Sequence, residues 1–363
     1  MVGNAYIHIP FCKTKCKYCS FVSFTDKEYR IKNYLKALIR EINRYYRGEN
    51  LKTIYFGGGT PSILDIDTIG QILQKFIFIP DFCEITFEVN PDDAELWYLR
   101  ELRNLGINRL SIGAQTFDDD ILSLIGRRHN SKQTLKVVEN AKKAGFRNIS
   151  LDLIYGLPNQ NKNTLQKDLE VIKSLDIQHI STYGLKIEEP SNFYYFRPNN
   201  LPDDDIQADM YLMINEFLKN CGYNRYEISN FSKPKFESKH NLNYWGNFEY
   251  YGFGAGAHGY LCGVRYSNRA DLEDYILNAV KRSTEHLVTT KEKFEEEIFL
   301  GLRREVGIDT SKIKKKYGID FDLKYKNVLE KFYPEYLEKT PCGYKFTTKG
   351  ILLSNNILAE FIE

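Results

Sequence analysis

Three cysteines stand close together near the start of the chain. In the segment IHIPFCKTKCKYCSF, residues 7–21, Cys12, Cys16 and Cys19 are separated by three and then by two residues. A structural zinc site normally closes its shell with four nitrogen or sulfur ligands, so three thiols need a distant fourth ligand or leave one metal position open. Three thiolates on one short loop can instead hold three corners of an iron–sulfur cluster, whose fourth iron binds a small molecule. The spacing alone leaves both the open cluster and a zinc-bearing structural protein as interpretations.

Glycine and polar residues follow two later apolar segments. The first ends in YFGGGTPS, where glycines 57–59 allow a ligand to approach the backbone and Thr60 offers a hydroxyl. The second ends in TFEVNP, where Glu88 could accept hydrogen bonds from ribose hydroxyls. Each of these features alone is more often a turn or a solvated strand end. Their common position after strands predicts that they lie with the cysteines at the carboxyl-terminal end of the strands, which we call the mouth.

The elements that must position these residues alternate between strand-like and helical patterns. Apolar and β-branched runs predict six strands, each followed by room for one crossover helix, as in 29–46 and 203–220. Such crossovers require a parallel sheet with helices outside it. We expect an α/β fold with an incomplete (β/α)6 TIM-like barrel, and a doubly wound open sheet is the alternative. The predicted strands are 5–11, 52–57, 84–90, 109–115, 148–156 and 179–185.

The composition bounds the class of protein. The 363 residues suffice for one large domain and a smaller one, and 50 Lys and Arg against 48 Asp and Glu give a net charge of +2, which does not favour a nucleic-acid partner. The seven cysteines are an odd number and the other four are scattered, so no disulfide framework is indicated. No apolar run of about 18 residues and no signal peptide are evident. We therefore expect a cytoplasmic protein with reduced thiols.

The pattern of the chain changes in its last third. A stretch rich in Tyr, Asn and Gly runs over about 226–267, and helical patterns follow at 272–280 and 291–304. We predict a first domain over 1–285 that includes this extension, and a C-terminal helical or winged-helix-like domain over 286–363. The segments YKFTT and ILLSNNIL belong to that tail, and the lysine run KIKKKYG reads as a solvated helix face.

A second candidate site lies in the extension, in the segment KHNLNYW. A neutral imidazole of His240 could bind haem iron, and Tyr244 and Trp245 could flank a flat macrocycle. The alternative is a buried His and Trp that only pack the loop, because a lone histidine is usually not a ligand. His258, among glycines in GAGAHGY, is a secondary candidate, and His8 reads as packing in the first strand.

The order of motifs carries a family resemblance. YIHIPFC with its two further cysteines, YFGGGTP, FEVNP, RLSIGAQTF and LDLIYGLP together resemble the radical S-adenosylmethionine superfamily over residues 5–261. The resemblance is to the branch of oxygen-independent coproporphyrinogen III oxidase and of haem chaperones of the HemW type. It implies a [4Fe–4S] cluster on Cys12, Cys16 and Cys19 that chelates S-adenosylmethionine. The first molecule would meet Tyr6, Gly58 and Glu88. A second, described for the oxidase, would meet Tyr18, Gly59, Thr60, Gln115, Arg127, Asp152 and Gly184.

Two features separate the oxidase from the chaperone. The oxidase pattern continues to a fourth cysteine where this chain has Phe21, and the oxidase has an N-terminal arm before its first strand. The chaperones carry an H-N-x-x-Y-W motif, which His240, Asn241, Tyr244 and Trp245 match. The resemblance therefore favours a haem chaperone over an oxidase that decarboxylates two propionates, and leaves open whether the protein is an enzyme.

The resemblance also implies partners. A haem chaperone would pass haem to acceptor proteins, with respiratory and membrane-associated proteins among the candidates. The cluster would need an electron donor such as flavodoxin or ferredoxin, and a homodimer is a further expectation. No residue is assigned a catalytic role from the sequence.

Overall fold

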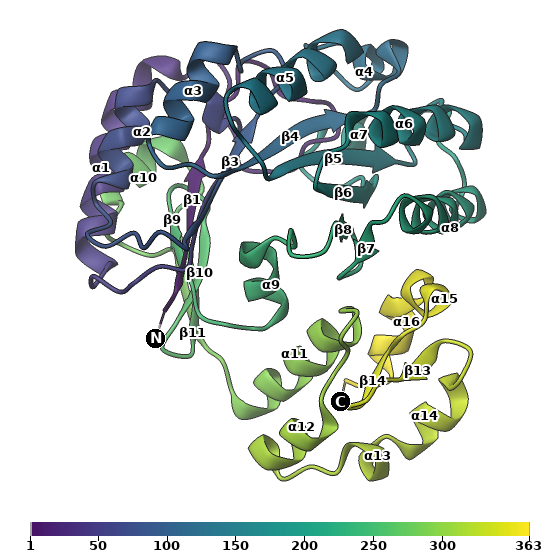
Figure 1. The fold of residues 1–363 in the computed structure, drawn as a ribbon. Helices are drawn as coiled ribbons and strands as arrows, with labels where there is room; N and C mark the ends of the chain where they lie inside the picture. The colour runs from purple at the N-terminus through teal and green to yellow at the C-terminus, as the bar shows by residue number, and fades with distance from the viewer. Residues whose placement is uncertain (1, 363) are drawn as a thin grey trace.

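Six parallel strands form the centre of the larger domain in the computed structural model, which describes residues 2–362 (Figure 1). Each predicted strand is confirmed, with its ends shifted by no more than a few residues. The strands lie in the sheet in chain order, without the reversal that defines a doubly wound sheet, so the fold is a partial barrel. They are β1 (Asn4–Ile9), β2 (Thr53–Gly58), β3 (Glu84–Val89), β4 (Arg109–Gln115), β5 (Ile149–Tyr155) and β6 (His179–Gly184).

Three short strands extend the sheet at its two edges. On one side β9 (Tyr251–Phe253) pairs in parallel with β1. On the other side β8 (Asn230–Ser232) runs antiparallel to β6 and carries β7 (Asn224–Arg225) at the outer edge. The nine-stranded order begins with β7 and ends with β9, so the barrel remains open along one side.

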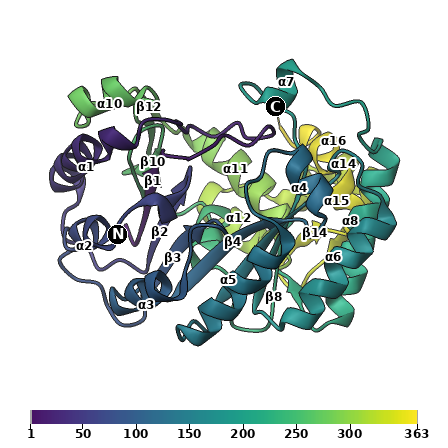
Figure 2. The ribbon, with the colours of Figure 1, turned by 90° about the horizontal axis from the view of Figure 1, so that it is seen from above.

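Helices cover the outer face of this sheet (Figures 1 and 2). Alternation in the strands turns apolar side chains such as Phe56, Phe87 and Ile112 outward, where they are fully buried beneath the helices. Asn130 and Asn161 each begin a helix with a capping box. The crossover helices are α1 (Ile31–Tyr45, after the turn η1, Glu28–Arg30), α2 (Ile66–Leu73, after η2, Pro61–Ile63), α3 (Leu96–Asn104), α4 (Asp119–Leu124), α5 (Ser131–Lys143) and α6 (Lys162–Leu175), followed by α7 (Asn192–Tyr195) and α8 (Asp204–Asn220).

The inner face of the sheet is polar. Tyr55, Ser111 and Asp152 come from three different strands and line the same internal space. Ser150 on β5 hydrogen-bonds to His179 on β6, with 2.7 Å between Oγ and Nδ1. Barrel interiors are usually filled by branched apolar residues. This one instead holds hydroxyls, carboxylates and imidazoles, which suits a binding chamber better than a packed core.

The extension after the barrel adds a helix and a small sheet. The helix α9 (Lys239–Trp245) lies between the barrel and the C-terminal domain (Figure 1). Antiparallel strands β10 (His258–Leu261), β11 (Val264–Ser267) and β12 (Thr284–Leu287) form the sheet, and α10 (Leu272–Asn278) packs against α1. The domain boundary proposed near residue 285 falls inside β12, so a division after this strand fits the elements better.

The C-terminal elements pack around a second hydrophobic cluster, which Tyr211 of α8 joins. The helices of this domain are α11 (Thr290–Leu302), α12 (Thr310–Tyr317), α13 (Phe321–Lys324), α14 (Lys326–Phe332), α15 (Thr348–Leu352) and α16 (Ser354–Ala359), with one hairpin of β13 (Leu337–Lys339) and β14 (Tyr344–Phe346). YKFTT supplies β14, whereas ILLSNNIL is helical. An ion pair of Arg225 with Glu305, 3.0 Å long, joins the domain to the edge of the barrel sheet.

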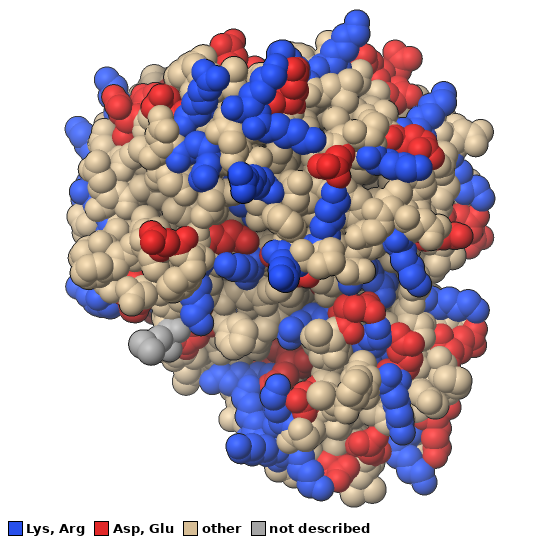
Figure 3. Space-filling view, viewed as in Figure 1, with Lys and Arg blue, Asp and Glu red and all other residues tan. Residues whose placement is uncertain are grey.

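The surface carries both signs of charge. Basic and acidic side chains are interspersed on the face drawn in Figure 3. In the lysine run, Lys314 pairs with Asp320 and Lys316 pairs with Glu297, as expected for a solvated helix face. Among residues 2–362, no helix is both long and apolar enough to span a membrane.

Candidate functional site

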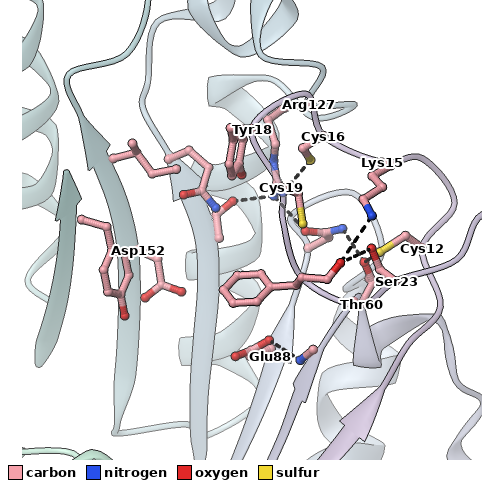
Figure 4. A pocket seen from close by; sticks show the side chains of 18 of the residues that line it. Cys12, Lys15, Cys16, Tyr18, Cys19, Ser23, Thr60, Glu88, Arg127 and Asp152 are labelled. Carbon is pink, nitrogen blue, oxygen red and sulfur yellow. Dashed lines mark hydrogen bonds between the residues drawn. The ribbon is translucent and has the colours of Figure 1, made fainter. Parts of the chain in front are cut away.

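A cavity of about 520 Å³ opens at the carboxyl ends of the barrel strands. Its wall contains every residue that the sequence analysis assigned to the cluster and to S-adenosylmethionine except Tyr6 (Figure 4). Tyr6 lies outside this wall: its hydroxyl is 2.9 Å from Nδ1 of His8 and its ring stacks on Tyr55. The residues that line the cavity are Cys12, Cys16, Tyr18, Cys19, Gly58, Gly59, Thr60, Glu88, Gln115, Arg127, Asp152 and Gly184.

The three cysteines lie on a loop that leaves β1 and returns to it. The amide of Cys12 donates to the carbonyl of Phe24 at 3.0 Å, and the amide of Phe24 donates to Pro10 at 2.7 Å. A further bond from the amide of Lys17 to Ile125 ties the loop tip to the end of α4. The loop is therefore held at its base and at its tip, with the thiols between.

The three thiols line the cavity in different environments. Burial raises the pKa of Cys12 and of Cys19, so the free protein keeps these thiols protonated. The Sγ atom of Cys12 accepts from the hydroxyl of Thr60 at 3.4 Å, and that of Cys16 lies 3.6 Å from Nη1 of Arg127 (Figure 4). Among the described residues, no three potential ligands are already gathered around one point. Metal binding would therefore release protons and draw the sulfurs together.

Gly59 sets the distance between this loop and β2. A Cβ at Gly59 would lie 2.7 Å from the carbonyl oxygen of Phe11 and 3.0 Å from Sγ of Cys12. Contacts that short are not tolerated, so only glycine fits here. The glycine run was predicted to admit a ligand, and at Gly59 the neighbour that comes close is the cysteine loop itself.

Two carboxylates face the cavity from neighbouring parts of the sheet. Glu88 accepts from the hydroxyl of Tyr55 at 2.7 Å and from the amide of Gly58 at 3.2 Å. Burial, reinforced by the nearby charge of Asp152, raises the pKa of Glu88 to about 7. Asp152 accepts from the hydroxyl of Ser111 at 3.1 and 3.2 Å, and burial raises its pKa too. Both groups can accept hydrogen bonds from a hydroxyl-bearing ligand once ionised.

Arg127 supplies the positive charge of the wall. Its Nη2 donates to the carbonyl of Gly113 at 2.7 Å and to Oδ1 of Asn90 at 2.8 Å, while its buried Nε has no partner. An intramolecular ion pair is the alternative role for each of Arg127 and Asp152, but the contacts found are those of Arg127 with Cys16, Asn90 and Gly113 and of Asp152 with Ser111. The adjacent Gln115 has a φ of 65° at a register shift, which ends β4 and turns its backbone toward the mouth.

The second candidate site lies at the opposite end of the barrel. The amides of Lys239 and His240, at the start of α9, donate to the carboxylate of Glu84 at 3.2 and 3.1 Å. Glu84 and Thr53 are the first residues of β3 and β2, so α9 caps the amino-terminal end of the strands. The cysteine loop follows the carboxyl end of β1. The two sites predicted from the sequence therefore do not form one pocket.

The imidazole of His240 is buried, and both of its nitrogens have partners. Nδ1 is 2.7 Å from the hydroxyl of Thr53, and Nε2 is 2.9 Å from the hydroxyl of Tyr244. Burial, with a smaller effect of Arg109, lowers the pKa of His240 to about 3. In this structure the packing role weighed for His240 is realised. Asn241 and Trp245 are partly exposed on the same helix, and His258 is exposed on β10.

Sequence reasoning missed the residues that hold α9 in place. Asn243 hydrogen-bonds to Asn4, which also accepts from Thr53, and Tyr55 stacks on the ring of His240 at 5.0 Å between centroids. The signal that could have indicated them is the alternation in NAYIHI and TIYFGG, which places polar and aromatic residues on the inner face of the first two strands.

The comparisons with known proteins agree with this fold. The family signature described as the radical SAM superfamily matches residues 6–172, and the superfamily implies a [4Fe–4S] cluster and S-adenosylmethionine. Coproporphyrinogen III oxidase (HemN) from Escherichia coli has the same fold, with a TM-score of 0.87 over 99% of this chain and 90% of that chain at 24% identity.

More similar sequences narrow the assignment. The chain is 40% identical to the heme chaperone HemW of Bacillus subtilis, covering 99% of both chains. It is 39% identical to the heme chaperone HemW of Lactococcus lactis, over 99% of this chain and 97% of the relative. The chain therefore belongs to the HemW family of heme chaperones.

Proposed function

We propose that this protein is a haem chaperone, which holds a [4Fe–4S] cluster and S-adenosylmethionine at the mouth of its barrel and passes haem to acceptor proteins. The observation that carries the proposal is the similarity to heme chaperones along 99% of the chain. Phe21, 67% exposed at the rim of the cavity, stands where the oxidase pattern has a further cysteine, which favours the chaperone over the oxidase.

The cavity residues support this role for the mouth. Cys12, Cys16 and Cys19 would hold the cluster, and Glu88 would accept from the ribose of S-adenosylmethionine. The unpartnered Nε of Arg127 would offer a donor to the carboxylate of a ligand. When bound, the cluster can supply the electron that cleaves a carbon–sulfur bond of S-adenosylmethionine. The proposal includes one or two bound molecules of S-adenosylmethionine. It also includes an electron donor such as flavodoxin or ferredoxin, which reduces the cluster.

The haem motif supports the proposal with a condition attached. Because both nitrogens of His240 are hydrogen-bonded, binding of haem iron by His240 requires one of the two contacts, with Thr53 or with Tyr244, to break. The partly exposed Asn241 and Trp245 are the first motif residues that haem would meet. Candidate acceptors are respiratory and membrane-associated haem proteins, and a homodimer is part of the same proposal.

A haem titration of the anaerobically reconstituted protein tests this function. We expect a Soret shift in the wild type that weakens in His240→Ala and persists in His179→Ala. His179 is the matched control because it is equally buried and its nitrogens also contact two hydroxyls, those of Ser150 and Tyr226. His258→Ala asks whether the exposed imidazole contributes. Absence of haem binding by the wild type, or conversion of coproporphyrinogen III to protoporphyrinogen IX, would overturn the chaperone proposal.

A further inference from the structure

The two ends of the barrel are joined by one side chain that neither site includes in its predicted ligand set. Tyr55 is on β2, between the floor that α9 caps and the glycines of the mouth. One face of its ring is stacked on His240 at 5.0 Å and 28° between planes. Its hydroxyl donates to Oε1 of Glu88 at 2.7 Å. A single ring therefore contacts both the haem-motif histidine and the carboxylate predicted to hold ribose.

The residues around Tyr55 restrict the positions that its ring can take. A Cβ at Gly57 would lie 2.8 Å from the Tyr55 ring and 2.9 Å from Oε1 of Glu88, so the glycine is what allows the two side chains to meet. Tyr6 stacks on Tyr55, with ring centroids 6.0 Å apart. His240 in turn is fixed by Thr53 and Tyr244. A displacement of His240 removes one wall of this arrangement and frees the Tyr55 ring to move.

We propose that Tyr55 is a positioning residue that links the haem motif to the S-adenosylmethionine pocket, so that haem binding through His240 weakens the binding of S-adenosylmethionine at Glu88. The haem half of this inference rests on the proposed function. Its physical basis is that the imidazole of His240 is buried and both of its nitrogens are hydrogen-bonded, so haem iron can reach it only if the ring or α9 shifts, which also disturbs the ring face stacked on Tyr55. By linkage, S-adenosylmethionine then weakens haem binding by the same factor. The protein would release one ligand as it takes up the other.

A double-mutant cycle on S-adenosylmethionine affinity tests the link without haem. Tyr55→Phe removes the hydroxyl that holds Glu88, and His240→Ala removes the ring that supports Tyr55. We expect each single variant to weaken S-adenosylmethionine binding about threefold to tenfold in equilibrium dialysis of the reconstituted protein. The double variant should be no weaker than Tyr55→Phe alone. Additive losses, or none, would overturn the link.

Two controls distinguish the link from general damage. Tyr98→Phe removes a buried hydroxyl that donates to the carbonyl of Leu64 at 2.9 Å, outside the cavity wall, and should leave the affinity unchanged. His240→Phe keeps an aromatic face against Tyr55 and should restore the affinity that His240→Ala loses. Loss in His240→Phe equal to that in His240→Ala would contradict a role of the stack.

The effect of haem itself is tested on the wild-type protein. We expect saturating haem to weaken S-adenosylmethionine binding by the factor found for His240→Ala, and to have no such effect on Tyr55→Phe. Haem that binds without changing the affinity would overturn the coupling and leave the chaperone proposal intact. If the wild type binds no haem, the chaperone proposal fails, and the cycle still decides whether Tyr55 positions Glu88.

Discussion

The mouth and the floor of the barrel are built from the same strands but satisfy their polar groups in different ways. At the mouth, Arg127 keeps a buried Nε without a partner, and Glu88 and Asp152 face a large cavity. At the floor, both nitrogens of His240 and both amides at the start of α9 have protein partners. The mouth leaves charged groups facing a cavity, whereas at the floor the imidazole of His240 and the first amides of α9 are satisfied within the chain, and the buried Nδ2 of Asn243 is not.

This difference changes how the two motifs should be interpreted. The cysteine motif lies on a loop with its thiols toward a cavity, as expected for a ligand site. The H-N-x-x-Y-W motif lies on a helix that closes the barrel, so its histidine is also a structural residue. Loss of haem binding in a His240 variant therefore needs a stability measurement beside it before it identifies an iron ligand.

The largest expected effect is at the mouth. Cys16→Ser removes a proposed cluster ligand whose side chain is only partly buried, so reconstitution should fall from about four irons per chain to near zero. The exposed Cys342 supplies the control, because Cys342→Ser should keep the full iron content. Iron and sulfide analysis with the absorbance near 400 nm measures both. A cluster that survives in Cys16→Ser would remove this cysteine from the site.

A substitution at the floor should instead change the free energy of unfolding. His240→Ala breaks two buried hydrogen bonds and leaves a cavity, which should lower the free energy of unfolding by about 2–4 kcal/mol. Phe21→Ala at the exposed rim should change it by less than about 0.5 kcal/mol. Urea unfolding of the two variants checks the contrast. Equal effects would show that the floor is not more tightly packed than the mouth.

Lower pH should reduce the stability of the fold through the buried histidines at the floor. The pKa of His240 is lowered to about 3 and that of His179 lies well below its usual range, so both stay neutral when folded but gain a proton when unfolded below about pH 6.5. Stability should thus fall as the pH drops from 6.5 toward 3, by up to about 1.4 kcal/mol per pH unit for each histidine. His240→Phe should have a shallower pH dependence, and an unchanged slope would place the titration elsewhere.

At the mouth, we expect pH to change the affinity for S-adenosylmethionine rather than the stability of the fold, and by a smaller amount of free energy. Glu88, with a pKa of about 7, is half ionised near neutrality, and only the carboxylate accepts from two ribose hydroxyls. S-adenosylmethionine binding should strengthen severalfold as the pH rises from 6 to 8. Glu88→Gln should bind more weakly with a flatter profile. A profile identical to that of the wild type would assign the titration to another group.

The barrel and the mouth could be predicted from the sequence because their signals are local. Each strand has its own apolar run, and Cys12, Cys16 and Cys19 stand within eight consecutive residues. The position of the haem motif could not be predicted in this way. His240 meets Thr53 across 187 positions, and nothing in KHNLNYW indicates which end of the barrel it caps. Tyr6 was assigned to S-adenosylmethionine by resemblance alone, and no local pattern indicated the contact of its hydroxyl with His8.

The short strands at the two edges of the open sheet have a consequence for assembly. A partial barrel presents free edges, and long exposed edges promote pairing with other chains. Here β7 has two residues and β9 has three, and residue 227, next to β7, bridges to Arg304 of the C-terminal domain. Neither edge offers a long template for another strand. The barrel can therefore stay open between its two edges without offering other chains a long stretch of backbone to pair with.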